Sequence, residues 1–315
     1  MDPSIVYNVQ HGYYWDWKVA LDLFFGGAGV GAFIFGVALY ELWGRRYRRI
    51  PQTAAFLAPV LVGVGLLLLM LKLGRPHYIF QTFTNFAPTA PIWWGGVFQT
   101  VFLVGAIWYA HLWREEEPSP TRRRLGVALT PIAIVVGAYH GMLLAVMPSR
   151  PLWNTGPTVL AALAAFLTTG IAAVMIVHLF RMRQGGRLGD EEHVGTFLSD
   201  LKPVRNILAG ALLFQLGTFF LWWMSLRFGD LADREALAAA TVGFGTMFWI
   251  LGIGVGLVLP LAIGAYSVWN GHAEDVRHNV RIVALTSCLI LAGGLYFRLA
   301  VVLAGQLNPV FVTLP

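Results

Sequence analysis

The sequence predicts an all-α integral membrane protein with eight transmembrane helices in a single transmembrane domain over residues 1–315. Hydrophobic residues make up 57% of the chain and charged residues 12%, whereas an average soluble domain has about 25% charged residues. The apolar residues gather into eight stretches, and a helix needs about 20 such residues to cross a bilayer. The segments between the stretches are too short to form a second, soluble domain.

The eight expected spans follow one another with short connections. The first span is rich in glycine, and Gly27 and Gly31 are four residues apart, a spacing that lets two helix backbones approach closely. Glycines recur in the second and seventh spans, where tight helix packing is again the simplest interpretation. The spans are 20–43, 54–73, 93–113, 125–147, 157–180, 206–226, 241–268 and 282–305.

The basic residues predict the orientation of the protein. Fifteen of the 22 Lys and Arg residues lie in the connections 44–53, 114–124 and 181–205 and in the connection before the last span. The positive-inside rule places these connections in the cytoplasm and both termini outside. The net charge of +6 therefore reflects orientation in membrane lipid, and we expect no nucleic-acid partner.

The remaining segments complete this picture. The first 14 residues have no basic region typical of a signal peptide, so we expect the first span to act as an uncleaved insertion signal. The external segment 74–92 is aromatic and is expected to lie along the interface as a short helix or ordered loop. The external segment 148–157 is compact and rich in turn formers.

Asp22 is the most informative residue of the sequence, because it lies inside the first span. A carboxylate at membrane depth costs roughly 2.5–3.5 kcal/mol on insertion scales, so such a residue is a functional candidate. Tyr139 in the fourth span is expected at a similar depth toward the same face, with His140 beside it. Asp22 and Tyr139 have the chemistry to bind the opposed oxygens of a quinone, and His140 adds a second proton-active group.

The ionised residues within the spans concentrate in the outer half of the membrane, which predicts a polar cavity open to the outer face. Gly137 and Gly141 flank Tyr139 and would leave room for a flat ring. The cavity would serve a quinone, an ion or a small solute. Further residues expected to line it are Gly26, Arg75 and Arg298, together with the two glycines.

Three other interpretations stay open. Asp22 could simply neutralise Lys72 or Arg298, because intramembrane charges usually pair. A secondary transporter would also have a polar site at membrane depth, although such proteins usually show broken helices and matched halves. Haem would require two facing histidines, and His111 and His178 are the only eligible pair.

Several short strings resemble the integral membrane subunit of polysulfide reductase and its NrfD-type relatives. They are Pro91-Ile-Trp-Trp-Gly-Gly, Gly137-Ala-Tyr-His-Gly-Met and Ser149-Arg-Pro-Leu-Trp-Asn-Thr, with the opening of the first span, Trp15-Asp-Trp-Lys-Val-Ala-Leu-Asp. The resemblance covers all eight spans in number and order. Its motif residues with an expected structural role are Pro91, Trp93, Trp94, Arg150, Pro151, Trp153 and Asn154.

The resemblance implies two four-helix bundles side by side and a quinone site at the outer face of a bacterial or archaeal cytoplasmic membrane. It places the quinone-binding tyrosine on Tyr139 and a polar quinone contact on Asp22. It also implies a partner with iron–sulfur clusters, which in many members serves a molybdopterin subunit, and no metal in this protein. Cys288 is the only cysteine, and one thiol cannot hold an iron–sulfur cluster, which needs about four cysteine ligands.

We therefore expect the membrane anchor and quinone-binding subunit of a multisubunit respiratory oxidoreductase. It would exchange electrons between menaquinone or ubiquinone in the membrane and the iron–sulfur partner. The secondary transporter with an outward-facing polar site is the alternative.

Overall fold

The structure is a computed structural model that describes residues 15–44, 48–72, 80–115, 119–184, 191–269 and 276–307. These residues form helices joined by short turns, with no strand among them. Eight of the described helices are long and apolar enough to cross a membrane. The predicted fold class is confirmed. Arg75, one of the expected cavity residues, lies outside the described residues.

Most of the observed helices start and end within about six residues of the predicted spans. The exception is α7, which begins at Glu191 and so extends well into the connection 181–205. The helices are α1 (Trp17–Trp43), α2 (Arg49–Lys72), α3 (Gln81–Thr84), α4 (Pro91–Leu112), α5 (Pro120–Ala145), α6 (Thr158–Gln184), α7 (Glu191–Arg227), α8 (Leu231–Ala238), η5 (Ala239–Gly243), η6 (Thr246–Val258), α9 (Leu259–Trp269) and α10 (Val276–Ala304).

Local sequence explains several helix ends. The Asp16 carboxylate accepts a hydrogen bond from the Lys18 N–H and caps α1, because the first N–H groups of a helix have no partner within it. Gly44 closes α1 at a φ of 80°, which a residue without Cβ adopts readily. Pro91 and Pro120 stand at the starts of α4 and α5, where a missing N–H costs nothing.

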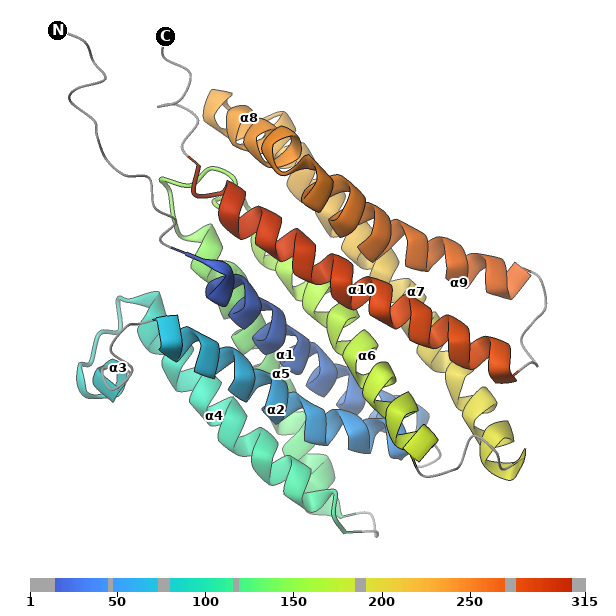
Figure 1. Ribbon diagram of the computed structural model, residues 1–315. Helices are drawn as coiled ribbons and strands as arrows, with labels where there is room; N and C mark the ends of the chain where they lie inside the picture. Colours follow the sequence, from blue (N-terminus) through green and yellow to red (C-terminus); the bar gives the residue numbers. More distant parts are fainter. Residues whose placement is uncertain are drawn as a thin grey trace, which may run out of the picture.

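The eight spans form two groups of four. In the first group, α1 packs on α2 and α5, and α4 packs on the same two helices. In the second, α10 packs on α6 and on the η6–α9 span, while α7 contacts α6 and α9. The groups meet where α1 lies against α6 and α10 (Figure 1).

Glycines allow the close contact between the two groups. A Cβ at Gly31 would overlap the carbonyl oxygen of Phe166, and a Cβ at Gly170 would overlap the backbone nitrogen of Ala32. Any larger residue at either position would force α1 and α6 apart. The small-residue spacing of the first span therefore serves helix packing, as expected from the sequence.

The seventh span departs from an α-helix. Residues Thr246–Val258 form a π-helix, preceded by the short π-helix Ala239–Gly243. Long π-helices are rare, and short π segments often occur at functional sites. Within η6, Gly256 packs directly on α10, since a Cβ there would lie 2.7 Å from the Cα of Gly293.

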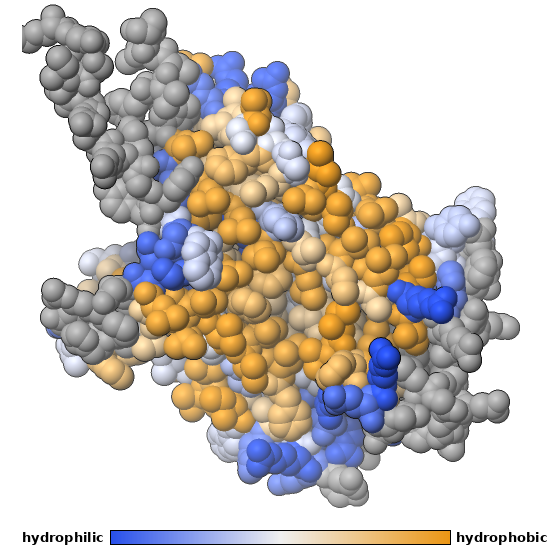
Figure 2. Space-filling view, viewed as in Figure 1, coloured by the Kyte–Doolittle hydropathy of each residue, from blue (hydrophilic) through white to orange (hydrophobic). Residues whose placement is uncertain are grey.

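The surface fits a lipid environment. Figure 2 shows apolar side chains across the middle of one face and hydrophilic residues gathered toward its ends. Large apolar side chains such as Val104, Leu213 and Ile250 are more than half exposed. Contact between these side chains and lipid tails is not unfavourable, whereas their exposure to water would cost free energy.

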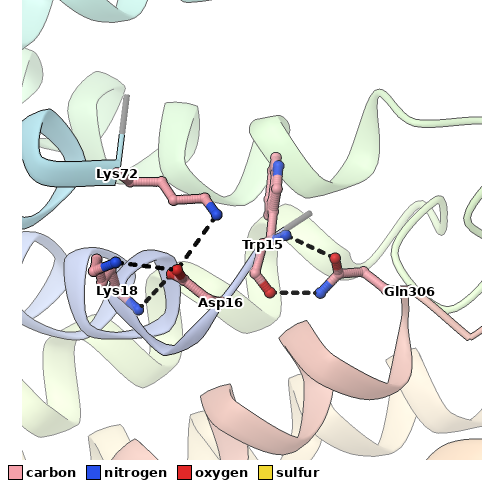
Figure 3. A network of polar contacts seen from close by, with 5 residues as sticks. All are labelled: Trp15, Asp16, Lys18, Lys72 and Gln306. Carbon is pink, nitrogen blue, oxygen red and sulfur yellow. Dashed lines mark hydrogen bonds and ion pairs between the residues drawn. The ribbon is translucent and has the colours of Figure 1, made fainter. Parts of the chain in front are cut away.

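The two ends of the bundle are distinct. Trp15 exchanges two hydrogen bonds of 2.7 Å with the Gln306 side chain (Figure 3), which brings the first and last described segments together. We call this the Trp15 end. At the opposite end, which we call the Arg49 end, the connection after α1 meets the connection after α4, where Arg48 donates to the Glu115 carbonyl at 2.8 Å.

Asp16 anchors the Trp15 end by polar contacts. Its carboxylate lies 3.3 Å from the ammonium groups of both Lys18 and Lys72 (Figure 3). Partial burial raises the pKa of Asp16, but the hydrogen bonds from the Lys18 N–H and the Lys72 ammonium outweigh this effect and hold the pKa below its ordinary value.

Candidate functional site

Asp22 is buried between the helices of the first group. The residue is 2% exposed. Its Oδ1 atom faces α2, where a Cβ on Gly65 would lie 2.9 Å away. Oδ1 has no hydrogen-bond partner among the described residues. A buried polar atom without a partner is costly, so this oxygen is free to accept a hydrogen bond.

The described cations do not neutralise Asp22. Lys72 bonds to Asp16 instead. Arg298 donates to the Gly294 carbonyl and lies in the second group of helices. Asp22 therefore forms no ion pair with Lys72 or Arg298, the two partners considered from the sequence.

Tyr139 projects from α5 onto α4. A Cβ at Gly95 would overlap Cζ of the Tyr139 ring, so the ring occupies the space that any other residue at Gly95 would fill. The phenol is half-buried, and it lies within electrostatic range of the Asp22 carboxyl group. No hydrogen bond joins these two described side chains.

His140 approaches α1 one helical turn from Asp22. Its Nδ1 atom is 2.7 Å from the carbonyl oxygen of Val136. A carbonyl can only accept, so Nδ1 carries the proton and Nε2 is left as an acceptor in the neutral ring. Nε2 points at α1, where a Cβ at Gly26 would lie 2.9 Å away. Gly26 is four residues after Asp22, so the acid and the imidazole approach the same stretch of α1.

The structure thus places three proton-active side chains in one region. Asp22 comes from α1, and Tyr139 and His140 come from α5, with their rings 5.9 Å apart. Gly65 of α2 and Gly95 of α4 complete the surroundings. Asp22 is in the second turn of α1, and Tyr139 is about two turns from the end of α5, so the region lies near the Trp15 end. It contains a carboxyl, a phenol and an imidazole.

The glycines expected to line a cavity divide into two sets. Gly26 does face His140. A Cβ at Gly137 would instead lie 2.7 Å from Leu163, and one at Gly141 would lie 2.8 Å from the Cα of Val159. Both glycines therefore let α5 pack closely on α6. They face α6 and do not provide the room for a flat ring beside Tyr139 that was predicted. Residues four apart share a face of a helix, and that face turns toward α6.

Arg298 lies apart from Asp22, in a second polar region. It is 8% exposed and lines a mostly apolar cavity of about 90 Å³ between α1, α5, α6, α7, η6 and α10. His140 also lines this cavity, so it stands between the two regions. Its wall also contains polar residues of α6 and α7 that were not predicted from the sequence, because threonine and glutamine in a span give little signal alone. They are Thr158, Thr168, Thr169 and Gln215.

The motif residues at the Trp15 end hold helix ends together. Arg150 donates to the Gln306 carbonyl at 2.5 Å, and the Trp153 indole N–H donates to the Val301 carbonyl at 2.8 Å. The Asn154 side chain donates to the Ala145 carbonyl. The first two contacts tie the connection between α5 and α6 to the end of α10, and the third ties it to the end of α5. Pro151 lies within the same turn.

The Pro91-Ile-Trp-Trp-Gly-Gly string starts α4. Pro91 occupies the first turn, and the Trp94 indole donates to the Pro88 carbonyl at 2.9 Å. The Trp93 ring packs on Trp94 and on Phe86. These contacts fix the start of α4, and hence the position of Gly95 under the Tyr139 ring.

His111 and His178, considered for haem, have different surroundings. His178 is buried, with Nδ1 3.4 Å from the Thr53 hydroxyl of α2. His111 is exposed on α4. Within the described residues there is also no group of three or more His, Cys, Asp or Glu side chains that could hold a metal ion.

Comparison with known proteins agrees with this architecture. Residues 6–310 match the family described as Polysulphide reductase, NrfD. The sequence is 27% identical to one of the chains of the polysulfide reductase of Wolinella succinogenes, over 93% of this protein and 94% of the relative. It is 26% identical to protein NrfD of Escherichia coli, over 93% of this protein and 95% of that one. One of the subunits of the selenate reductase of Mesobacillus selenatarsenatis is 21% identical, over 79% of this protein and 66% of the relative. Because the family match extends over nearly the whole sequence and includes all eight spans, this protein belongs to the NrfD family of polysulphide reductase.

Proposed function

We propose that this protein is the quinone-reactive membrane subunit of a multisubunit respiratory oxidoreductase. The observation that carries the proposal is Asp22: a buried carboxyl group with an unpartnered oxygen, close to a phenol and an imidazole, in a protein of the NrfD family. Relatives named as parts of polysulfide and selenate reductases support a role within a reductase complex.

The residues of the site suit the chemistry of a quinone. Such a ligand, when bound, exchanges two electrons and two protons. The Tyr139 hydroxyl would donate a hydrogen bond to one ring oxygen, and the Asp22 carboxylate would accept a proton from the other. Nε2 of His140 is an acceptor in the neutral ring and would take up a further proton. Menaquinone and ubiquinone both present the opposed oxygens that this arrangement requires.

The electrons would pass to a partner subunit with iron–sulfur clusters, which in turn would serve a molybdopterin subunit. The lone Cys288 cannot hold such a cluster in this protein. We place the partner at the Trp15 end, because Asp22 and Tyr139 lie near it. The positive-inside rule makes this end the outer face of a bacterial or archaeal cytoplasmic membrane.

The test is quinol oxidation by the assembled complex. Tyr139→Phe keeps the ring over Gly95 and removes only the hydroxyl. A lost hydrogen bond is worth about 0.5–1.5 kcal/mol, and more if a buried partner is left unsatisfied, so turnover should fall about tenfold. Tyr109→Phe is the matched control, since Tyr109 is a buried tyrosine in the same group of helices that packs on Phe33.

Asp22→Asn removes the proton acceptor with little change of shape. Turnover should fall more than quinol affinity does. Glu41→Gln is the control on the same helix, 19 residues or about 28 Å away, where the carboxylate pairs with Arg123 at 2.8 Å. Wild-type turnover in both the Tyr139 and the Asp22 variants, measured per assembled complex, would show that the site is elsewhere.

A further inference from the structure

The second group of helices contains a buried cation that the proposed quinone chemistry does not use. Arg298 is 8% exposed. The ion pairs among the described residues involve Asp16 and Glu41 but not Arg298. A charge taken out of water is costly unless an opposite charge or several hydrogen bonds compensate it.

The contacts of Arg298 leave much of the guanidinium uncompensated. One nitrogen donates to the Gly294 carbonyl at 2.9 Å, and another makes a long contact of 3.4 Å with the Thr169 hydroxyl. These contacts use two of its five N–H groups. The Phe24 and Phe166 rings lie 5.3 and 5.2 Å from the guanidinium carbon. These cation–π contacts stabilise the cation in part, but they bring no negative charge and leave N–H groups free.

The cavity beside Arg298 has room for a ligand. Its volume of about 90 Å³ exceeds the roughly 10–15 Å³ that one water needs on this measure. Its wall is mostly apolar but includes the polar side chains of Thr168, Thr169 and Gln215. Thr169 contacts Arg298, and Thr168 donates to Gln215 at 2.6 Å. Its wall extends to Thr158, the first residue of α6 at the Trp15 end, so the cavity runs toward that surface. The π-helix η6 contributes Gly252 and Gly256 to the wall, and both glycines let η6 pack closely on α10 beside the cavity.

We propose that this cavity binds a small monovalent inorganic anion of the chloride type, held by the guanidinium of Arg298. One anion matches the single uncompensated charge, whereas a divalent ion would leave an excess of negative charge in the bundle. The unused N–H groups of Arg298 supply the donors. His140 also lines this cavity, but Asp22 and Tyr139 are not part of its wall. The inference rests on Arg298 and its contacts and uses no step of the quinone chemistry.

Bromide is the probe, because it replaces chloride and scatters X-rays anomalously. Crystals of the intact complex grown in sodium gluconate and soaked in sodium bromide should show one anomalous peak against the Arg298 guanidinium. In solution, bromide added at constant ionic strength should raise the unfolding temperature of the complex in a saturable way, because a ligand that binds only the folded state stabilises it. Formate, tested in parallel, distinguishes a small carboxylate from a halide.

Arg298→Gln should lose both the peak and the saturable rise. Arg122→Gln is the matched control, because Arg122 is a buried arginine that stacks on Trp113 at 4.3 Å and donates to the Tyr40 hydroxyl. That variant should keep the bromide response. If Arg298→Gln does not assemble, Thr169→Val provides a milder change that should weaken the response.

Three outcomes would overturn the proposal. The first is wild-type crystals with no bromide at Arg298. The second is an unfolding temperature that changes with bromide without saturation. The third is a formate response that exceeds the bromide response, which would assign the cavity to a carboxylate. Quinol oxidation by the wild-type complex is measured separately, so a negative result here leaves the proposed function untouched.

Discussion

Gly65 and Gly63 of α2 offer a direct test of how the Asp22 region is built. A Cβ at Gly65 would lie 2.9 Å from Asp22 Oδ1, 2.9 Å from the Gly26 nitrogen and 3.1 Å from the Asp22 carbonyl oxygen. Two of these atoms belong to the backbone of α1 and cannot rotate away. At Gly63, two residues earlier, a Cβ would meet nothing within 4 Å.

The size of the effect follows from these distances. Ordinary van der Waals contact begins near 3.4 Å, so Gly65→Ala must move α1 and α2 apart by about 0.5 Å beside Asp22. Overpacking of this kind costs about 1–3 kcal/mol. A misplacement of about 1 Å at a reacting group can cost 10²-fold in rate, so we expect quinol turnover to fall about tenfold. Gly63→Ala should leave turnover unchanged.

The assay is quinol oxidation per assembled complex, with thermal unfolding measured in parallel. Both variants gain the same helix propensity, about 1 kcal/mol, so their difference isolates the contact with Asp22. Normal turnover in Gly65→Ala would refute the argument that α2 positions the carboxyl group. Equal loss in both variants would refute it as well, because Gly63 makes no such contact.

Further predictions concern other parts of the molecule. Gly95→Ala should displace the Tyr139 ring and lower turnover more than it lowers unfolding temperature; an unchanged rate would contradict the packing described. Trp153→Phe should lower the stability in thermal unfolding mainly through the space left by the smaller ring, because Trp153 is buried and stacked on Trp15; the lost indole hydrogen bond adds only about 0.5–1.5 kcal/mol, because the Val301 carbonyl still accepts from the Gly305 N–H. The stabilisation from Asp16 should be present above its unfolded pKa near 3.8 and be lost as the pH falls toward the lower folded pKa; Asp16→Asn should remove this part of the acid dependence. Reporter fusions after Arg124 should report cytoplasm and a fusion after Pro315 the outside, and a cytoplasmic C-terminus would overturn the proposed orientation.

Much of the fold follows from the sequence, because a bilayer imposes one simple condition on a helix. Each span must be apolar over a set length, so eight apolar stretches specify eight helices and place both ends of the protein on the same side. The same condition made Asp22 conspicuous, since a carboxylate within a span needs a reason. The alternation of basic connections is also a property of sequence alone, and two of these connections do meet at the Arg49 end.

The contacts within the bundle depend on how each helix is rotated about its axis, and hydropathy contains no such information in lipid. Only the tertiary structure places Gly65 against Asp22, Gly95 under Tyr139 and Gly137 against α6. The π-helix of the seventh span and the cavity beside Arg298 depend on how η6 packs on α10. Whether Asp22 and Tyr139 bind one ligand stays a prediction. These features result from packing between helices far apart in the sequence, which a single sequence does not reveal.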